Sequence, residues 1–150
     1  MNIRNATIED IDIICHQRRR MFEDMGFAEE AIAASMNKYP SWVRAQLQQD
    51  DYIGWFVEVD GDIAAGAGMW LIDWQPSPRS SSELRGYILN VYTELDYRYK
   101  GYARTLMNAI IDYAREHRIE TLVLHASEFG ENLYRSLGFK PTNEFSLKIR

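Results

Sequence analysis

The stretch Tyr-Arg-Tyr-Lys-Gly-Tyr-Ala-Arg at residues 97–104 separates two different hydrophobic patterns. Before it, residues 86–93 are mostly apolar, β-branched or aromatic, which predicts a β-strand. After it, apolar side chains recur at helical spacing from Tyr102 to Ala114, which predicts an amphipathic helix over about residues 102–117. The sequence therefore predicts a strand that passes through a short basic turn into a helix.

This turn has the features of an anion-binding site. The first N–H groups of a helix have no partner within the helix, and the helix dipole places partial positive charge beside them. Arg98, Lys100 and Arg104 add positive charge, and Gly101 lets a ligand approach the backbone because it has no Cβ. A second interpretation stays open, in which a glycine merely precedes a helix with a solvated basic surface.

Composition and charge exclude several classes of protein. A length of 150 residues predicts a single domain, 1–150, with a sizeable core. The net charge of −5 argues against a nucleic-acid partner, which requires a basic face. Cys15 is the one cysteine, so neither an intramolecular disulfide nor a cysteine-cluster metal site is expected, and a reducing, cytoplasmic setting fits. No signal peptide is recognisable and no apolar run approaches the ~18 residues of a membrane span, so no membrane partner is expected.

The remaining patterns predict a mixed α/β (α+β) domain with a mostly antiparallel sheet flanked by helices. Asp60-Gly61 is a strong hairpin signal, and the helix after Gly101 provides one parallel crossover. Ser127 is predicted to cap a short helix that ends at Gly138. Further strands are expected at 3–6, 52–59, 63–74, 121–125 and 145–149, and further helices from Thr7 to near Gly26, at 28–37, and at 41–49 after a break at Pro40.

The glycines do not form a known nucleotide-binding fingerprint. Gly66-Ala67-Gly68 could begin a dinucleotide motif, but Leu71 occupies the third glycine position and the segment lies inside a hairpin. Lys100 precedes Gly101 without the earlier glycine of a phosphate-binding Walker loop. A nucleotide-binding domain is therefore disfavoured, and the small residues at 64–68 instead predict a bulge or a close backbone approach.

Two motifs in this sequence resemble those of the GNAT family of acetyl-CoA-dependent N-acetyltransferases. Arg98-Tyr-Lys-Gly101-Tyr-Ala103 is similar to the family's Arg/Gln-x-x-Gly-x-Gly/Ala turn directly after a strand. Leu133-Tyr134-Arg-Ser-Leu137-Gly138-Phe139 is similar to the family's second segment, about thirty residues later. The resemblance implies a sheet that is splayed at the cofactor cleft and a chain that binds acetyl-CoA without a metal.

The resemblance also implies roles for individual positions. Backbone groups of Val91 and Thr93 would pair with the pantetheine arm of CoA, and Ser127 stands where many members have an asparagine that contacts the cofactor. The pyrophosphate would be held by the turn, through main-chain amides from Arg98 to Ala103 and through nearby side chains. The residues of this turn are Arg98, Tyr99, Lys100, Gly101, Tyr102, Ala103 and Arg104.

The resemblance places Tyr134 near the CoA sulfur, which makes it the candidate general acid. A thiolate of intrinsic pKa ~8.5 can take a proton from a phenol of pKa ~10, although a tyrosine beside Leu133 could also be simply packed. The general base is unresolved. Glu83 and Glu94 are close in sequence, but strand parity does not clearly point either side chain inward. His125 is a third candidate, which at a strand end could equally be a structural hydrogen-bonder, and a water chain is a further alternative.

The sequence thus predicts an enzyme that transfers an acetyl group from acetyl-CoA to an amine of a small molecule or a protein. The alternative is a non-catalytic acyl-CoA-binding sensor, which the lack of an obvious base would favour. The acceptor is expected among the helices at 20–49 and the loop at 75–84. Acidic side chains there, such as Glu23, Asp24 and Glu29, could attract a cationic amine, although a solvated helix face is the favoured interpretation. The oligomeric state is not predicted, and a homodimer is one alternative because many members of the family are dimers.

Overall fold

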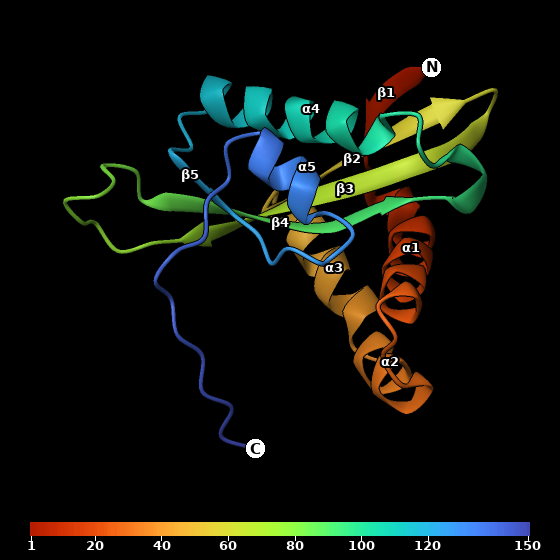
Figure 1. The fold of residues 1–150 in the computed structure, drawn as a ribbon, viewed down its shortest axis with the longest axis horizontal. Coiled ribbons are helices and arrows are strands. Elements are labelled where there is room, and N and C mark those ends of the chain that lie inside the picture. The colour runs from red at the N-terminus through yellow and green to blue at the C-terminus, as the bar shows by residue number, and fades with distance from the viewer.

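The computed structural model describes residues 1–150, and its α+β fold with one five-stranded sheet confirms the predicted class. The chain alternates between the sheet and two sets of helices (Figure 1). The strands are β1 (Asn2–Asn5), β2 (Tyr52–Val59), β3 (Asp62–Asp73), β4 (Leu84–Thr93) and β5 (Thr121–Val123). The helices are α1 (Ile11–Asp24), α2 (Glu29–Met36), α3 (Tyr39–Gln48), α4 (Tyr102–Glu116) and α5 (Glu131–Ser136), with 3₁₀ turns at Ile8–Asp10 and Leu95–Tyr97.

The sheet has the order β1-β2-β3-β4-β5 and is antiparallel except at its last pair. β5 runs parallel to β4, and α4 makes the crossover between them, as the sequence predicts. Only three residue pairs join these two strands, from Arg85–Thr121 to Tyr87–Val123. Beyond Tyr87 the two strands separate, so the predicted splay is present.

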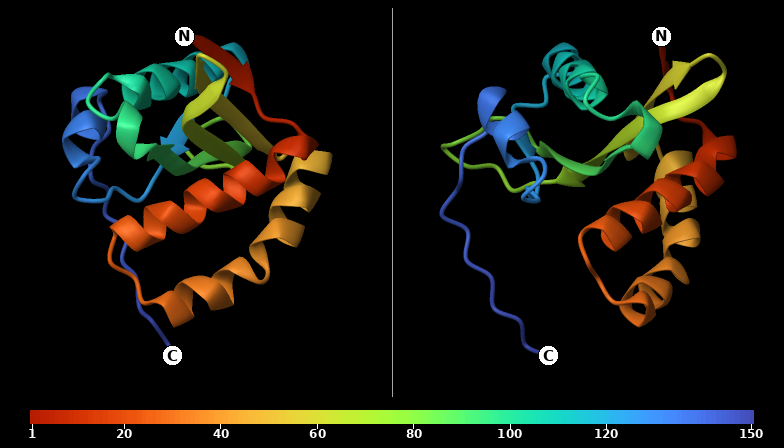
Figure 2. Two further views of the ribbon diagram at one scale, coloured as in Figure 1. Left: turned by 90° about the vertical axis from the view of Figure 1, so that its right-hand side faces the viewer. Right: turned by 45° about the vertical axis from the view of Figure 1, so that its right-hand side comes forward.

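Helices cover both faces of the sheet (Figure 2). On one face, α4 turns the fully buried side chains of Leu106, Met107 and Ile110 towards the strands, where they join one core cluster with Val57 and Met69. On the other face, α1 and α3 build a second cluster around residues such as Ile14, Val43 and Phe56. No helix is long and apolar enough to cross a membrane.

Two local predictions at glycines are confirmed. The β2–β3 hairpin turns at Asp60 and Gly61, whose φ values of 51° and 85° are those of a tight hairpin turn. In β3, a Cβ at Gly66 would lie 2.2 Å from the Gln17 side chain of α1, and one at Gly68 would lie 2.2 Å from the Tyr52 hydroxyl. The small residues of β3 therefore allow α1 and a β2 side chain to approach the sheet closely.

Two predicted helix starts are wrong. Ser127 does not cap α5: the N-cap is Gly130, and the Ser127 carbonyl accepts the N–H groups of Gly130 and Glu131, both at 3.1 Å. Pro40 does not mark the break between the helices but lies in the first turn of α3, which begins at Tyr39, and the break falls at Asn37 and Lys38. A proline is tolerated there because its missing N–H would have no partner in the first turn.

The predicted strand at 145–149 is also wrong. The structure has no strand after α5, and the segment 140–150 extends away from the rest of the molecule (Figure 1). A strand needs a neighbouring strand to satisfy its backbone groups, and none lies beside this segment. β5 is likewise shorter than the predicted 121–125, because β4 turns away from it after Tyr87.

Candidate active site

A β-bulge in β4 lies at the point where β4 and β5 separate. Gly68 pairs with Leu89 and Gly66 with Tyr92, so Asn90 and Val91 together face the single residue between the two glycines. Asn90 is buried and has a φ of 59°, in the left-handed region. Bulges bend a strand and change the direction of its side chains, and here the bend opens the sheet edge beside β5.

Side-chain hydrogen bonds hold this bulge in place. Asn90 Nδ2 donates to the hydroxyls of Tyr39 and Tyr52, at 2.9 and 3.0 Å, and Asn90 Oδ1 accepts from the Arg18 guanidinium at 2.8 Å. The Arg18 guanidinium carbon also lies 4.1 Å from the centroid of the Tyr39 ring. One polar side chain therefore connects β4 to α1, α3 and β2.

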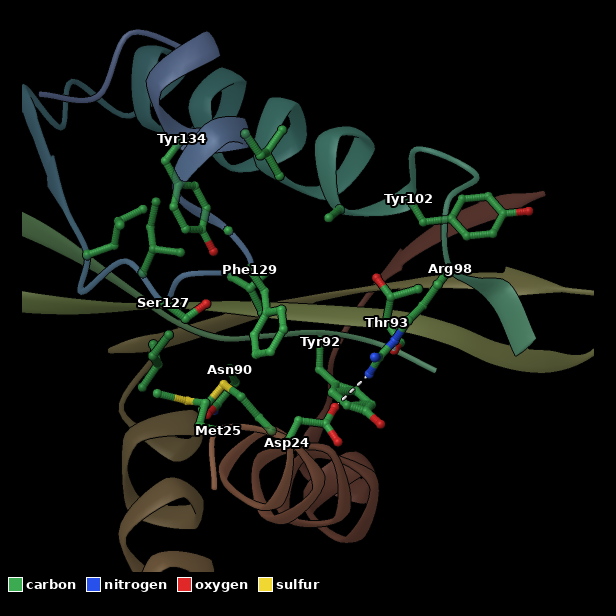
Figure 3. Close-up of a pocket in the computed structure, with 18 of the residues that line it drawn as sticks. Asp24, Met25, Asn90, Tyr92, Thr93, Arg98, Tyr102, Ser127, Phe129 and Tyr134 are labelled. Carbon is green, nitrogen blue, oxygen red and sulfur yellow. Dashed lines mark hydrogen bonds and ion pairs between the residues drawn. The ribbon is translucent and has the colours of Figure 1, made fainter. Parts of the chain in front are cut away.

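A cavity of about 930 Å³ occupies the opening between β4 and β5 (Figure 3). Its walls come from α1, β4, the turn at 97–104, the segment after β5, and α5. The cavity thus joins the two motifs of the sequence at one site. The predicted site residues that line it are Val91, Thr93, Arg98, Tyr99, Gly101, Tyr102, Ala103, Arg104, Ser127 and Tyr134.

The basic turn leaves the first amides of α4 without partners in the helix. The first backbone hydrogen bond of α4 runs from Thr105 N–H to the Gly101 carbonyl, at 3.1 Å. Tyr99 and Gly101 have φ values of 64° and 83°, and a Cβ at Gly101 would meet no protein atom within 4 Å. The amides beside Gly101 therefore border the cavity as unpaired donors, which is the arrangement that binds phosphate groups.

The basic side chains of the turn are attached to neighbouring elements. Arg98 donates to the Thr93 carbonyl at 2.9 Å and to Asp24 at 2.7 Å, and the hydrogen bond to Asp24 raises the pKa of Arg98 (Figure 3). Arg104 donates to the Ser136 hydroxyl of α5 at 2.8 Å. Lys100 does not line the cavity, and its ammonium lies 5.5 Å from the centroid of the Tyr97 ring.

Tyr134 lies on α5 and faces the cavity, on the same side as Ser127 (Figure 3). The residue is buried, and burial raises the pKa of its phenol above the ordinary value. Desolvation disfavours the phenolate, so the hydroxyl keeps its proton at neutral pH. Its ring packs edge-to-face against Phe139, with centroids 6.0 Å apart.

One of the three candidate bases lies at the cavity. His125 follows β5, lines the cavity, and shares a hydrogen bond between its Nδ1 and the Tyr87 hydroxyl. Glu83 and Glu94 do not line it; Glu94 accepts from Gln17 on α1. The Tyr87–His125 pair crosses the gap between β4 and β5, which sequence spacing alone did not reveal.

The cavity includes only part of the region in which the acceptor is predicted to bind. The cavity takes four residues from α1 and Met25 directly after it, but none from α2, α3 or the loop at 75–84. Glu29 instead forms an ion pair with Arg19 at 2.8 Å, and Glu23 also lies outside the cavity wall. The four α1 residues are Arg18, Met21, Phe22 and Asp24.

Several lining residues were missed from the sequence, among them Arg18, Asn90 and Phe129. Arg18 was missed because it belongs to a run of three arginines, which is typical of a solvated helix face. Asn90 did carry a signal, because it is the one amide side chain in an otherwise apolar and aromatic strand. No group of three or more His, Cys, Asp or Glu side chains could hold a metal ion.

The chain is similar to several solved structures of acetyltransferases. A GCN5-related N-acetyltransferase from Ralstonia eutropha is 35% identical, with a TM-score of 0.94 over 99% of this chain and 97% of that chain. A predicted acetyltransferase from Clostridium acetobutylicum, solved with acetyl-CoA, is 28% identical, with a TM-score of 0.91 over 99% of this chain and 95% of that chain. A ribosomal-protein-alanine N-acetyltransferase from Brucella melitensis shares the fold at 21% identity, with a TM-score of 0.67 over 100% of this chain and 99% of that chain.

No match is found among the curated proteins. The family model for the acetyltransferase (GNAT) family matches residues 16–139, which is most of the chain and includes both sequence motifs, the β4 bulge and the walls of the cavity. The protein therefore belongs to the acetyltransferase (GNAT) family.

Proposed function

We propose that the protein transfers an acetyl group from acetyl-CoA to an amine that enters beside α1. The observation that carries this proposal is the single cavity that joins the unpaired amides of α4 to the gap between β4 and β5 and to Tyr134. These three features suit the phosphates, the extended arm and the thioester of one elongated ligand. An acyl-CoA donor combines all three.

The residues of the cleft fit CoA along its length. The amides near Gly101 would bind the pyrophosphate, and the free edge of β4 at Val91 and Thr93 would pair with the amides of the pantetheine arm. The Thr93 carbonyl already accepts from Arg98, so its N–H is the group left for the ligand. Ser127, on the opposite wall, would donate a hydroxyl hydrogen bond to the same arm.

Tyr134 is proposed as the general acid. When an amine attacks the thioester carbonyl, the carbonyl oxygen becomes an oxyanion, for which a β4 amide near Val91 would be the donor. Collapse of the intermediate breaks the carbon–sulfur bond, and the thiolate takes the proton of the Tyr134 hydroxyl. The raised pKa of Tyr134 keeps that proton available at neutral pH.

His125 is proposed as the proton acceptor for the attacking amine. It lies on the cavity wall and its ring is oriented by Tyr87. Histidine is the side chain that most readily exchanges protons near neutral pH. We expect His125→Gln to lower kcat/KM for the acceptor by about 10–100-fold. Tyr87→Phe should lower the rate less, and an unchanged kcat/KM in His125→Gln would exclude the base role.

Turnover is tested by measuring free CoA thiol and acetylated product from acetyl-CoA and a panel of amines. The panel contains small primary amines, amino acids, polyamines and peptides with a free N-terminus or lysine. We expect release of CoA thiol with at least one acceptor class above the rate of hydrolysis. Tight binding of acetyl-CoA without release for any acceptor would favour the sensor instead. Tighter binding of ATP than of CoA would exclude the cleft assignment.

A further inference from the structure

The guanidinium of Arg18 lies in the wall of the cavity without a carboxylate partner. Its neighbours Arg19 and Arg20 both form ion pairs with Glu23, at 4.0 and 3.4 Å. Arg18 forms no ion pair, and its one hydrogen bond runs from Nη1 to the neutral Asn90 side chain, at 2.8 Å. Charges that are withdrawn from water are usually paired with an opposite charge, so this one is left for a ligand.

The Arg18 side chain is held in one position by the groups around it. Its guanidinium carbon lies 4.1 Å from the centroid of the Tyr39 ring and 4.8 Å from that of the Phe22 ring. Nε is buried without a hydrogen-bond partner, and Nη1 donates to Asn90. Nη2 forms no hydrogen bond with the protein, so it is the group that remains for a ligand in the cavity. A guanidinium fixed by stacking loses little side-chain entropy when it binds an anion.

The other arginines and the one acidic side chain of the cavity have other roles. Asp24 binds Arg98 at 2.7 Å, so these two charges neutralise each other. Arg104 lies in the first turn of α4, where the phosphates of CoA would bind. Arg18 instead lies near Tyr87, the hydrogen-bond partner of the proposed base: burial raises the pKa of Tyr87, and the Arg18 charge opposes this shift. The unpaired charge is therefore on the acceptor side of the cavity.

An apolar surface lies beside this guanidinium. Met21, Phe22 and Met25 follow Arg18 at spacings of three, four and seven residues, which places them on the same face of α1 and its C-terminal cap. Phe129, which is 81% exposed, extends from the opposite wall towards α1 (Figure 3). Large apolar side chains that are exposed inside a cavity favour a ligand with an apolar part.

We propose that Arg18 is a specificity-determining residue and that the acetyl acceptor is an α-amino acid with an apolar or aromatic side chain. The guanidinium would bind the carboxylate, and the apolar face of α1 together with Phe129 would contact the amino-acid side chain. One guanidinium matches the single charge of a carboxylate, whereas a phosphate monoester carries close to two charges. The inference rests on the proposed acetyl transfer and names the class of amine that it uses.

The transfer step leaves the carboxylate unchanged. The α-amine nitrogen bonds to the acetyl carbon while the carbon–sulfur bond breaks. The amine gives up its proton to His125, and the CoA thiolate takes one from Tyr134. The products are an N-acetyl amino acid and CoA with a free thiol.

Binding without transfer is the first test. Calorimetric titration in the presence of free CoA compares phenylalanine with phenylethylamine, which lacks the carboxylate. We expect the wild-type protein to bind phenylalanine about 10-fold more tightly, and Arg18→Gln to lose this preference. Arg20→Gln removes the same charge from the same helix outside the cavity and should keep it. No binding of phenylalanine, or equal wild-type affinity for the two ligands, would overturn the inference without a folded variant. A preference that persists in folded Arg18→Gln, checked by circular dichroism, would do so too.

Acetyl transfer separates this inference from the proposed function. The ratio of kcat/KM for phenylalanine to that for phenylethylamine should fall about 10–100-fold from the wild type to Arg18→Gln, and the difference in amine basicity cancels in this comparison. Turnover of amines with an unchanged ratio would overturn the role of Arg18 and leave the proposed function intact. Binding of phenylalanine through Arg18 without transfer to any amine would have the opposite meaning. Faster acetylation of glutamate than of phenylalanine or leucine would contradict the apolar contact.

Discussion

At the scale of single residues, Asn90 has the most connections at the site. Its amide satisfies two buried tyrosine hydroxyls and the Arg18 guanidinium while its own backbone stays in the left-handed region. Asparagine tolerates that region better than most residues, and its side chain offers both donors and an acceptor. Asparagine therefore meets both requirements, the left-handed backbone and the three hydrogen bonds.

We therefore predict that Asn90→Ala lowers the free energy of unfolding by about 1–3 kcal/mol, because it leaves buried polar groups without partners. The acetyl-transfer rate should fall as well, since the bulge shapes the cavity. Urea titration measures the first effect. Asn108→Ala on the exposed face of α4 is the control and should change little. Equal stability of the two variants would contradict the role given to Asn90.

Tyr134 can be tested by removing one oxygen atom. Tyr134→Phe should lower kcat by about 10–100-fold with little change in acetyl-CoA binding, because it removes a proton donor and keeps the packing. Steady-state kinetics and a binding titration separate the two effects. Tyr113→Phe, on α4 and outside the cavity wall, should keep the full rate. An unchanged kcat in Tyr134→Phe would remove this hydroxyl from the mechanism.

At the scale of elements, the start of α4 combines local backbone geometry with ligand binding. Gly101 has a φ of 83° and open space where a Cβ would be, so its neighbours in the protein do not require a glycine. The left-handed backbone at this position requires a glycine, and the proposed phosphate would occupy the space where a Cβ would lie. A substitution there thus has one structural and one ligand-dependent effect.

A matched pair of variants separates these effects. Gly61 has a φ of 85° and equally open space, but it lies in the β2–β3 hairpin, away from the cavity. We expect Gly101→Val and Gly61→Val to destabilise the fold by similar amounts, about 1–2 kcal/mol. Only Gly101→Val should weaken CoA binding, by at least 10-fold in calorimetric titration. Equal CoA affinity in the two folded variants would exclude the turn as the phosphate site.

At the scale of the whole molecule, buried phenols connect stability to alkaline pH. Burial raises the pKa values of Tyr39, Tyr52 and Tyr134, so the folded protein keeps these protons at a pH where the unfolded chain, with an ordinary phenol pKa of ~10, has lost them. The unfolded state then binds fewer protons, and stability falls as pH rises above about 10. We predict a lower urea midpoint at pH 10.5 than at pH 8.5, measured by fluorescence. An equal midpoint would contradict the burial of these hydroxyls.

Features with a local cause were predictable from the sequence. The strand, turn and helix around residues 97–104 follow from a change of periodicity and one glycine, and the hairpin at Asp60-Gly61 follows from its turn residues. These signals are local because backbone sterics and side-chain spacing act over a few residues. The two family motifs extended this prediction to the class of reaction, and the family match confirms that class.

The tertiary structure decided what depends on distant residues. Arg18 and Asn90, or Tyr87 and His125, meet because α1 packs on β4 and because β5 lies parallel to β4, and no spacing in the chain encodes those contacts. The conformation of the segment 145–149 also depends on distant residues. The prediction of a strand there is wrong, because a strand exists only where another strand supplies hydrogen bonds, and this chain alone supplies none.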